Sequence, residues 1–538
     1  MTQKIYLSVF LFFAIIFISC SKDNGTENPP DKPPITEIDV LTFKKSSNSD
    51  QEMIQKAVDY AAANKIGTVT IPDGEYMVDA TYTTKGIVLK DNIHLKLADN
   101  AVLKAIPSTD ERYAVIRVQN VGNVKISGGK IIGERYQHTG TSGEWGYGID
   151  LHTAVNVDIR NITITDCWGD GILIALNSKK VSVTNVICDN NRRQGMSVVG
   201  VDGLLVKNSI FSNTNGTAPE AGIDLEPSWK MENVQNVWID SCTFKNNAGL
   251  GLHIYGEFNF VTNIKVTNCI VDNNPIGVSL RFPDVNNVEL SNIKISNSSI
   301  QGLRVFEGSK DVKMSKITIT ESARNAVTIS DAANVEMADF KVNGFTTNGI
   351  LVDKSSNVKI STSDFQTTNV AAVIANLKNS KTIDMSRINI TGGKTGISSL
   401  KNEALVLSEN TLDKQSETGL YLNDTHAAVV RENHFKNIAQ TPINVYNSNG
   451  NKISKNIFIN NCFHTDNTYA QIYFDGSSQN NEFNNNAVSK GATANRAAYG
   501  IWLRSATQGN MILNNTISPE SYRKAQIKDD SGKNQINK

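Results

Sequence analysis

From Gly148 onward the chain repeats one pattern: a glycine followed by alternating apolar and polar residues, as in "GIDLHTAVNVDI" and "GLHIYG". A second short run of the form "NVxI" follows, often with an Asn-rich turn such as "DNNRRQG". Alternation with period two in short runs broken by Asn and Gly predicts β-strands, about three in each repeat. The clearest markers of the repeat are Gly148, Gly171, Gly195, Gly222, Gly251, Gly277 and Gly302.

Repeats of about two dozen residues predict coils of strand stacked into a solenoid. A β-propeller needs repeats about twice as long, and the leucine spacing of leucine-rich repeats is missing. Weaker markers continue through Gly349, Gly396 and Gly419 to Gly500. We therefore predict an all-β fold in which one solenoid domain spans residues 41–538.

A helix is predicted before the coils, over about residues 50–64, with Asp50 as its N-cap. Its apolar face consists of Ile54, Ala57, Val58, Ala61 and Ala62. Such a helix would cover the first coil, whose edge has no neighbouring strand.

The helix, the following "GTVTIPDGEYMV" (67–78) and the coils resemble the pectate-lyase-like superfamily of single-stranded right-handed parallel β-helices. This resemblance implies the fold and a polysaccharide ligand, because lyases, glycoside hydrolases, epimerases and phage tailspikes occur in the superfamily. It does not assign the reaction. The polygalacturonase motifs are missing, and "VWIDS" (237–241) and "RFPDVN" (281–286) match pectate-lyase motifs only in part, without the final His and Arg.

The first 20 residues have the layout of a signal peptide: Lys4, an apolar run, then Ser19 and Cys20. "FISC" (17–20) resembles a bacterial lipobox, which implies lipidation at Cys20, and "SKD" after it resembles a surface-export signal of Bacteroidetes-type lipoproteins. Residues 21–40 begin Pro-rich and polar and are predicted to be a disordered tether. We expect an extracytoplasmic lipoprotein of the outer membrane or cell surface, in contact with membrane only through its lipid.

Charge and cysteine content exclude several function classes. Lys plus Arg and Asp plus Glu both number 53, so no net charge favours nucleic acid or an anionic membrane. Apart from Cys20, the cysteines form no CxxC pair and no zinc spacing, and recur at similar places in the repeats. We interpret Cys167, Cys188, Cys242, Cys269 and Cys462 as small core residues.

Candidate chemistry lies on one face of the first coils. The first and third residues after each marker are apolar and should face the core, so the second and fourth should face solvent. These outward positions, with residues at the turns before them, gather ionisable and aromatic side chains. The candidate set is Asp150, His152, Asp170, Arg192, Arg193, Asp224, Glu226, His253, Tyr255, Arg281 and Arg304.

Asp224 and Glu226 project from one strand about 7 Å apart, a spacing that suits glycoside hydrolysis. We predict Glu226 as general acid and Asp224 as base, with Asp170 as a substitute, and His253 and Arg193 beside them. The remaining members of the candidate set would bind sugar. Two insertions, 133–148 and 212–222, flank this face, and the first offers Tyr136, His138, Trp145 and Tyr147 for stacking.

Two alternatives stay open. The hydrolase hypothesis requires no cofactor. In a lyase or epimerase, Asp224, Glu226 and Asp170 could instead hold Ca²⁺, and Arg281, Arg304 or His253 would act on a uronate. A non-catalytic glycan-binding or adhesin-like surface protein is the other alternative. The expected partner in each case is a polysaccharide or oligosaccharide.

Overall fold

The computed structural model describes residues 36–81, 83–228, 231–322 and 324–537. The predicted signal peptide, Cys20 and most of the predicted tether lie outside these residues. The folded unit starts at Glu37, not at residue 41. Strand β1 (Glu37–Asp39) pairs in parallel with β2 (Thr68–Ile71), and a 3-10 helix, η1 (Val40–Ser46), follows. The last residues of the predicted tether are therefore part of the fold.

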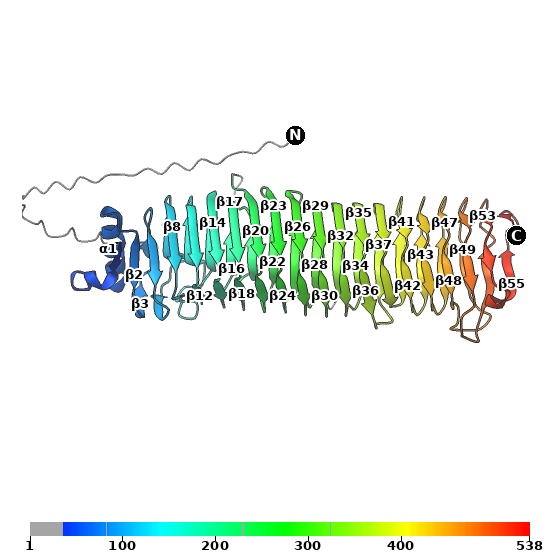
Figure 1. Ribbon diagram of the computed structural model, residues 1–538, viewed down its shortest axis with the longest axis horizontal. Coiled ribbons are helices and arrows are strands. Elements are labelled where there is room, and N and C mark those ends of the chain that lie inside the picture. The colour runs from blue at the N-terminus through cyan, green and yellow to red at the C-terminus, as the bar shows by residue number, and fades with distance from the viewer. Residues whose placement is uncertain (1–35, 82, 229–230, 323, 538) are drawn as a thin grey trace, which may run out of the picture. The chain divides into compact units, whose positions relative to one another are not determined.

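The predicted cap is present as helix α1 (Asp50–Ala63) at the N-terminal end of the coils (Figure 1). Its N-cap is Ser49, whose hydroxyl accepts the Glu52 amide at 3.2 Å, and not Asp50 as predicted. Asp50 instead accepts the Met77 amide at 2.9 Å, which ties the helix to β3 (Gly74–Val78). The buried helix face contains Ile54, Ala57, Val58 and Ala61, as predicted, together with Met53.

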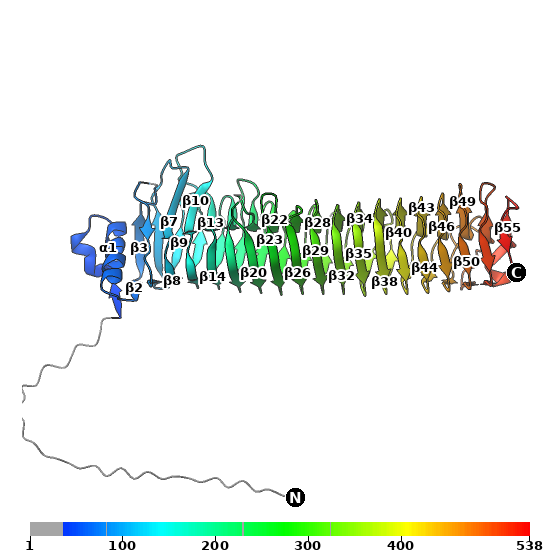
Figure 2. The ribbon, with the colours of Figure 1, turned by 90° about the horizontal axis from the view of Figure 1, so that it is seen from above.

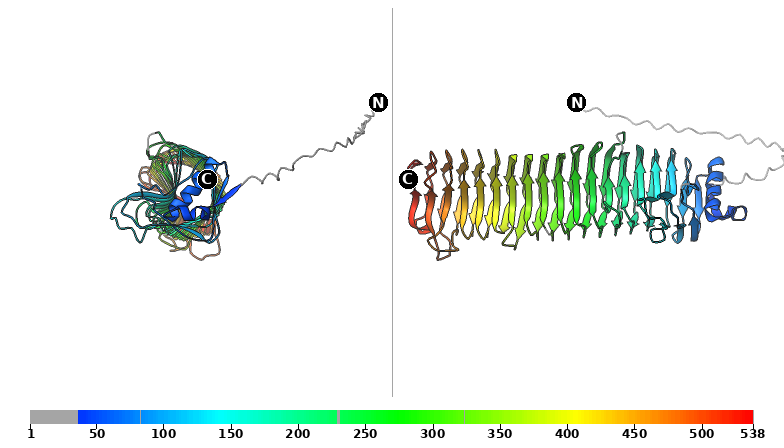
Figure 3. Two further views of the ribbon diagram at one scale, coloured as in Figure 1. Left: turned by 90° about the vertical axis from the view of Figure 1, so that its left-hand side faces the viewer. Right: turned by 180° about the vertical axis from the view of Figure 1, so that it is seen from behind.

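The rest of the unit is the predicted right-handed parallel solenoid (Figures 1 and 2). It has about 19 turns. Each full coil contributes one strand to each of three sheets, and every pairing is parallel and joins neighbouring coils. Viewed along the axis, the coils superimpose and several loops project from them (Figure 3). Among the described residues, no helix is both long enough and apolar enough to span a bilayer.

Sheet C carries the candidate residues. Its strands are β4 (Ile87–Val88), β7 (Arg112–Gln119), β10 (Trp145–His152), β13 (Asp170–Ala175), β16 (Gln194–Val198), β19 (Ala221–Leu225), β22 (Leu250–Tyr255), β25 (Ile276–Arg281), β28 (Gln301–Phe306), β31 (Asn325–Ser330), β34 (Asn348–Asp353), β37 (Val373–Lys378), β40 (Thr395–Leu400), β43 (Thr418–Asn423), β46 (Thr441–Tyr446), β49 (Ala470–Asp475), β52 (Ala497–Leu503) and β55 (Tyr522–Asp529).

Sheets A and B complete each coil. Beside the candidate residues, sheet A contains β8 (Gly122–Ser127), β11 (Val155–Arg160), β14 (Ser178–Thr184), β17 (Val201–Lys207), β20 (Val234–Asp240), β23 (Val261–Thr267) and β26 (Val285–Ser291). Sheet B there contains β9 (Lys130–Ile132), β12 (Thr163–Thr165), β15 (Ile187–Asp189), β18 (Ile210–Ser212), β21 (Thr243–Lys245), β24 (Ile270–Asp272) and β27 (Lys294–Ser296). The same order continues to β56 (Gln535–Ile536).

In the core, apolar side chains at equivalent positions of consecutive coils stack on one another. Ile149, Ile172, Met196, Ile223 and Leu252 pair in register on sheet C, and each is fully buried. Rings stack in the same way, as Phe211 and Phe244 do at 5.7 Å. The five cysteines of the repeats are buried and free, which confirms their interpretation as core residues.

The marker glycines are required by close contact between coils. A Cβ on Gly195 would lie 2.5 Å from the carbonyl oxygen of Gly222, and one on Gly222 would lie 2.6 Å from that of Gly251. Real side chains do not approach a backbone oxygen so closely, so these coils require glycine at this point, whereas some later coils have another residue there, such as Ala326 and Pro442.

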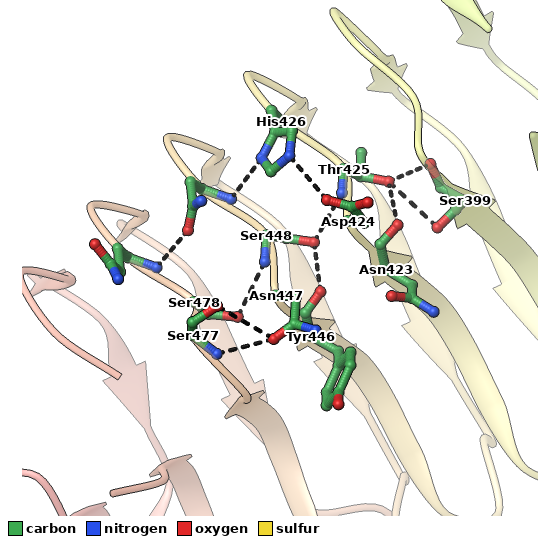
Figure 4. A network of polar contacts seen from close by, with 12 residues as sticks. Ser399, Asn423, Asp424, Thr425, His426, Tyr446, Asn447, Ser448, Ser477 and Ser478 are labelled. Carbon is green, nitrogen blue, oxygen red and sulfur yellow. Dashed lines mark hydrogen bonds and ion pairs between the residues drawn. The ribbon is translucent and has the colours of Figure 1, made fainter. Parts of the chain in front are cut away.

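Polar side chains at the turns bind the coils to one another. Around Ser448, the Thr425 amide donates to the Ser448 hydroxyl at 3.0 Å, and the Ser448 amide donates to Ser478 at 3.3 Å (Figure 4). A second ladder runs through Asn410, Asn433 and Asn456. The Asn433 carboxamide oxygen accepts the backbone amide of Asn410 at 2.9 Å, and the Asn456 carboxamide oxygen accepts the backbone amide of Asn433 at 2.9 Å. These ladders provide hydrogen-bond partners for backbone amides at the turns, which have no partner within a sheet.

Candidate functional site

The predicted column of outward positions exists on sheet C. In register it reads Arg117, Asp150, Leu173, Ser197, Asp224, His253, Ser279 and Arg304. These side chains point away from the core, but the prediction that they face solvent is wrong for most of them, because every residue of this column except Arg304 is buried. Asp150, Asp170 and Asp224 are at most 2% exposed, and His253 is 6% exposed.

The carboxylates are buried among side chains of neighbouring coils, such as Gln194 and His253 around Asp224. At the edge of the same face, the Glu232 carboxylate accepts the Leu176 amide at 2.9 Å. On the other side Arg192 donates to the carbonyl of Gly143 at 3.0 Å, which fixes the inserted loop 133–144. Figure 2 shows loops rising beside β7 and β10 in this part of the stack.

Asp224 is held by neighbours from the two adjacent coils. Gln194 donates to its Oδ2 at 2.8 Å, and His253 Nδ1 lies 3.1 Å from its Oδ1. Ser197 in turn donates to the Gln194 carboxamide oxygen. Asp224 is therefore buried between adjacent coils with its Oδ2 bonded to Gln194, which suits a positioning role better than direct contact with a sugar.

Glu226 is half-buried and has the surroundings of a general acid. Burial, and then the neighbouring Asp224, raise its pKa to about 8, and Arg193 opposes the shift only in part. A carboxyl with this pKa carries its proton at neutral pH. The predicted division between a protonated Glu226 and its neighbour thus has a physical basis.

Asp170 and Arg193 form a buried ion pair with a 3.1 Å contact between Oδ2 and Nη1. Burial raises the pKa of Asp170 to about 6, although Arg193 lowers it. Burial opposes the charge of Arg193 as well, but Asp170 and Glu144 more than offset this and raise its pKa above the usual value. Arg193 is therefore a fixed cation.

A groove of about 620 Å³ opens beside this pair, and we call it the basic groove. Four cations line it, Lys85, Arg112, Arg117 and Arg193, together with Trp145, Tyr147, Gln119, Asp150, His152 and Glu232. Several of these residues were not predicted from the sequence, notably Lys85, Arg112, Arg117 and Glu232. Arg117 could have been found, because "AVIRVQ" (114–119) has the same alternation, but its coil lacks a marker glycine.

Asp150 is the centre of the basic groove. His152 Nε2 lies 3.0 Å from its Oδ1, and Arg117 Nη1 lies 3.6 Å from its Oδ2. Gln119 also donates to Oδ2 at 3.3 Å. The His152 side chain is 25% exposed, so the ring joins the buried carboxylate to the open groove.

Two aromatic residues form the wall near the inserted loop. The Arg112 guanidinium lies 5.3 Å from the centre of the Trp145 ring. Tyr147 is buried, and burial, then Asp170 and Asp150, raise its pKa above the usual value, so its phenol keeps its proton. The predicted contribution of this loop to the groove is therefore present in Trp145 and Tyr147.

The loop residues Tyr136 and His138 do not line the basic groove. Tyr136 is exposed and contacts Asn190, while His138 is buried against Glu134 at 2.7 Å and stacks on Trp168 at 4.0 Å. Arg192 covers the Trp168 ring at 3.8 Å. These contacts hold the inserted loop against the neighbouring coils.

Three further predicted sugar-binding residues lie on later coils, away from the basic groove. Arg281 contacts Glu307 at 2.5 Å, and Tyr255 packs edge-on against Phe282 at 4.8 Å. Arg304 donates to Ser279 at 2.9 Å, and burial, then Arg281, lower its pKa to about 10. They form a second cluster on the same face.

The predicted calcium ligands do not form a cation site. In the described part of the chain, no three His, Cys, Asp or Glu side chains are grouped so that they could hold a metal ion. Asp224 and Asp170 contact Gln194, His253 and Arg193 instead. These residues do not fit Ca²⁺, and calcium dependence stays a prediction from the sequence.

The partial pectate-lyase motif "VWIDS" lies on sheet A, where β20 ends at Asp240. It is therefore on a different face from the basic groove. The second partial motif begins at Arg281, in the later cluster.

Known proteins resemble this chain mainly through its fold. It is 30% identical to the SPbeta prophage-derived uncharacterized protein YorA of Bacillus subtilis over 242 residues, 39% of this chain and 41% of that protein. The chain thus spans about two fifths of the length of that curated relative. The bacteriophage Phi29 gene product 12 N-terminal fragment has a TM-score of 0.52 at 13% identity, covering 89% of this chain and 93% of that one.

A solved GH87 α-1,3-glucanase catalytic unit from Streptomyces thermodiastaticus has a TM-score of 0.46 at 14% identity, over 67% of this chain and 66% of that one. The family description "right handed beta helix region" matches residues 85–236, 230–365, 325–488 and 372–538. Together these matches run through nearly all of the parallel coils. The chain therefore belongs to the right-handed β-helix family.

Proposed function

We propose that this protein is a carbohydrate-active enzyme that acts on a uronate-containing polysaccharide in the basic groove. The observation that carries the proposal is the placement of four cationic side chains, Lys85, Arg112, Arg117 and Arg193, around the Asp150–His152 pair. Cations at a groove wall bind the carboxylate of a uronate, and Trp145 offers a ring against which a sugar can stack.

The groups of the groove suit removal of the proton at C5, the carbon that bears the uronate carboxylate. Arg117 and Arg112 would neutralise the carboxylate, which stabilises negative charge developing at C5. His152, held at Nε2 by Asp150, would accept the proton at Nδ1. Tyr147 lines the same groove in its protonated form and would supply a proton to the leaving oxygen as negative charge develops there.

Two outcomes follow from the same first step. If the C5–H electron pair forms a C4=C5 double bond, the C4–O bond breaks and Tyr147 protonates the leaving oxygen, which is a lyase reaction. If a proton returns to C5 from the opposite face, the sugar is epimerised. Either reaction balances without a further reactant.

A hydrolase is the second candidate, and the raised pKa of Glu226 favours it. Glu226 would protonate the glycosidic oxygen, and Asp224 or Asp170 would activate water. Because Asp224 is 1% exposed and its Oδ2 is bonded to Gln194, this mechanism requires the side chains around Asp224 to move.

The test is incubation of the protein with alginate, polygalacturonate and neutral dextran, with and without chelator. Ultraviolet absorbance detects unsaturated ends, reducing ends detect any cleavage, and proton NMR in D₂O detects deuterium at C5. We expect unsaturated ends or deuterium with an acidic polymer. Reducing ends alone would favour the hydrolase, and no change on any acidic polymer would contradict the proposal and favour a binding protein.

The matched variants are Asp150→Asn and Asp158→Asn. Asp150→Asn removes the charge that holds His152 and should lower turnover about 10²-fold or more. Asp158 lies in the same coil but on β11 of sheet A, so Asp158→Asn should keep full turnover. Equal turnover in both variants would remove Asp150 from the mechanism.

A further inference from the structure

The outward column that contains Asp150 and Asp224 continues to the far end of sheet C. Its middle positions, Thr328, Leu351, Asn376 and Ser398, carry no charge. Its last positions are Tyr421, Asn444, Tyr473, Trp502 and Lys528. Large aromatic side chains therefore return on the same face in the C-terminal coils.

Two of these aromatic residues, Tyr473 and Trp502, form one cluster with Tyr499, which lies three residues before Trp502 on β52, and we call this cluster the C-terminal aromatic patch. The Trp502 ring centre lies 5.4 Å from that of Tyr473 and 4.9 Å from that of Tyr499. Trp502 Nε1 donates to Asp530 at 2.8 Å, which fixes the orientation of the indole. All three rings are only half-buried.

Cations surround the patch. Arg504 lies 4.9 Å and Lys528 4.5 Å from the Trp502 ring, and Lys524 lies 5.7 Å from that of Tyr499. Asp530 contacts Lys528 at 3.3 Å and offsets part of this charge. Asp475 lies near Tyr473. Three cations over fixed, partly exposed rings are more than a solvated sheet face needs for its own stability.

We propose that the C-terminal aromatic patch is a second carbohydrate-binding site, which takes an acidic oligosaccharide. Sugar rings stack their C–H faces on indole and phenol rings, and Arg504, Lys524 and Lys528 supply partners for carboxylates. The proposal goes beyond the activity of the basic groove and does not depend on it, because the patch has its own rings and its own cations.

The two sites lie on one face but far apart. From β10 to β52 there are fourteen inter-strand steps of about 4.8 Å, so the separation is about 65 Å. A short oligosaccharide can occupy only one site at a time. A long polymer can reach both, and the patch would then keep the polymer on the protein between turnovers.

The experiment is affinity electrophoresis of the full chain through gels containing alginate, polygalacturonate or neutral dextran. The variants are Trp502→Ala and Lys528→Ala, and Trp238→Ala is the control. Trp238 is a 44% exposed tryptophan on sheet A, remote from both sites. Circular dichroism establishes that each variant is folded. Lys528→Ala tests the patch even if Trp502→Ala unfolds, because Lys528 is not a core residue.

We expect the acidic gels to retard the wild-type protein and the Trp238→Ala variant equally. Trp502→Ala should raise the dissociation constant about tenfold and Lys528→Ala about threefold. The proposal is overturned if both variants are retarded like the wild type, if neither acidic gel retards the wild type, or if dextran retards it as strongly.

Failure of this proposal is distinguishable from failure of the proposed function. Asp150→Asn should lose turnover but keep its retardation, whereas Trp502→Ala should keep turnover of short oligosaccharides. If Asp150→Asn keeps turnover, the basic groove is not the active site and the patch is unaffected. If both Trp502→Ala and Lys528→Ala are retarded like the wild type, the patch proposal is wrong and the groove proposal is unaffected.

Discussion

Asp150 and Asp224 occupy the same column of sheet C, yet their neighbours give the two carboxylates different surroundings. Asp150 contacts His152 and Arg117 beside the open groove, while Asp224 is enclosed by Gln194 and His253. Between the two lies Arg193, paired with Asp170. Identical residues in one column can therefore have different roles, because each role depends on which side chains the adjacent coils supply.

Glu226→Gln should change how stability depends on pH. The pKa of Glu226 rises from 4.5 to about 8 on folding, so the folded state holds its proton more tightly than the unfolded chain. The stability that this provides is complete below pH 4.5 and is lost as pH rises toward 8. Glu226→Gln has no such loss.

Thermal unfolding between pH 4 and pH 9 checks this prediction. The difference between the two melting temperatures at pH 4 is the reference. As pH rises, the wild-type melting temperature should fall relative to that of Glu226→Gln. Parallel curves for the two proteins would mean that Glu226 ionises normally.

Arg193→Met should destabilise the protein because it leaves Asp170 buried without its cation. Loss of one member of a buried pair costs about 3–5 kcal/mol. The double variant Arg193→Met/Asp170→Asn should recover much of this, because no charge is then buried. Urea unfolding measures both, and an equal loss in the single and double variants would show that Arg193 acts through packing alone.

At the scale of the elements, each strand has few residues, and its neighbours above and below determine its place. Strands of sheet B often contain three residues, such as β15 and β18. Such strands cannot be stable alone. The marker glycines allow the close stacking, and the asparagine ladders connect the turns.

Asn433→Ala should break one such ladder. The Asn433 carboxamide accepts the Asn410 amide and donates to the Leu407 carbonyl at 3.0 Å, all in a buried turn. Its loss leaves those groups without partners and should cost about 2–4 kcal/mol in urea unfolding. Asn389, exposed on sheet B, is the control, and Asn389→Ala should cost under about 1 kcal/mol. Similar losses at both sites would contradict the importance of burial.

At the scale of the whole folded unit, the coils stack along one axis, and this arrangement places both candidate sites on the same sheet. Sheet C runs through the whole stack: β7 and β10, which contribute to the basic groove, lie near its N-terminal end, and β49 and β55, which contribute to the C-terminal aromatic patch, lie near the other (Figure 2). The ends of such a stack expose strand edges that could join another chain. Helix α1 covers the N-terminal end.

Ile54→Asp should remove this protection. Ile54 is fully buried under α1, and a charge there would detach the helix from the first coil. We expect concentration-dependent association in size-exclusion chromatography, with little loss of strand signal in circular dichroism. Asp59→Asn, on the exposed side of the helix, should stay like the wild type. Monomeric Ile54→Asp would show that the edge needs no helix.

The sequence by itself determined the coils, the capping helix, the buried cysteines and the column of outward residues. Each of these follows from a local period: two residues along a strand, about 3.6 along a helix and about two dozen from coil to coil. The period also placed Asp150 and His152 on one face, with Arg193 at a neighbouring turn and Trp145 in a flanking insertion, although it did not show which of them meet.

Only the tertiary structure decided which outward residues are open to solvent. Asp224 is buried by Gln194 and His253 from other coils, and Glu232 crosses back to Leu176 over 56 positions of sequence. Arg117 joins Asp150 from a coil that lacks the marker glycine. Burial and charge pairing depend on such distant segments, and a pattern that repeats within each coil contains no information about what covers it.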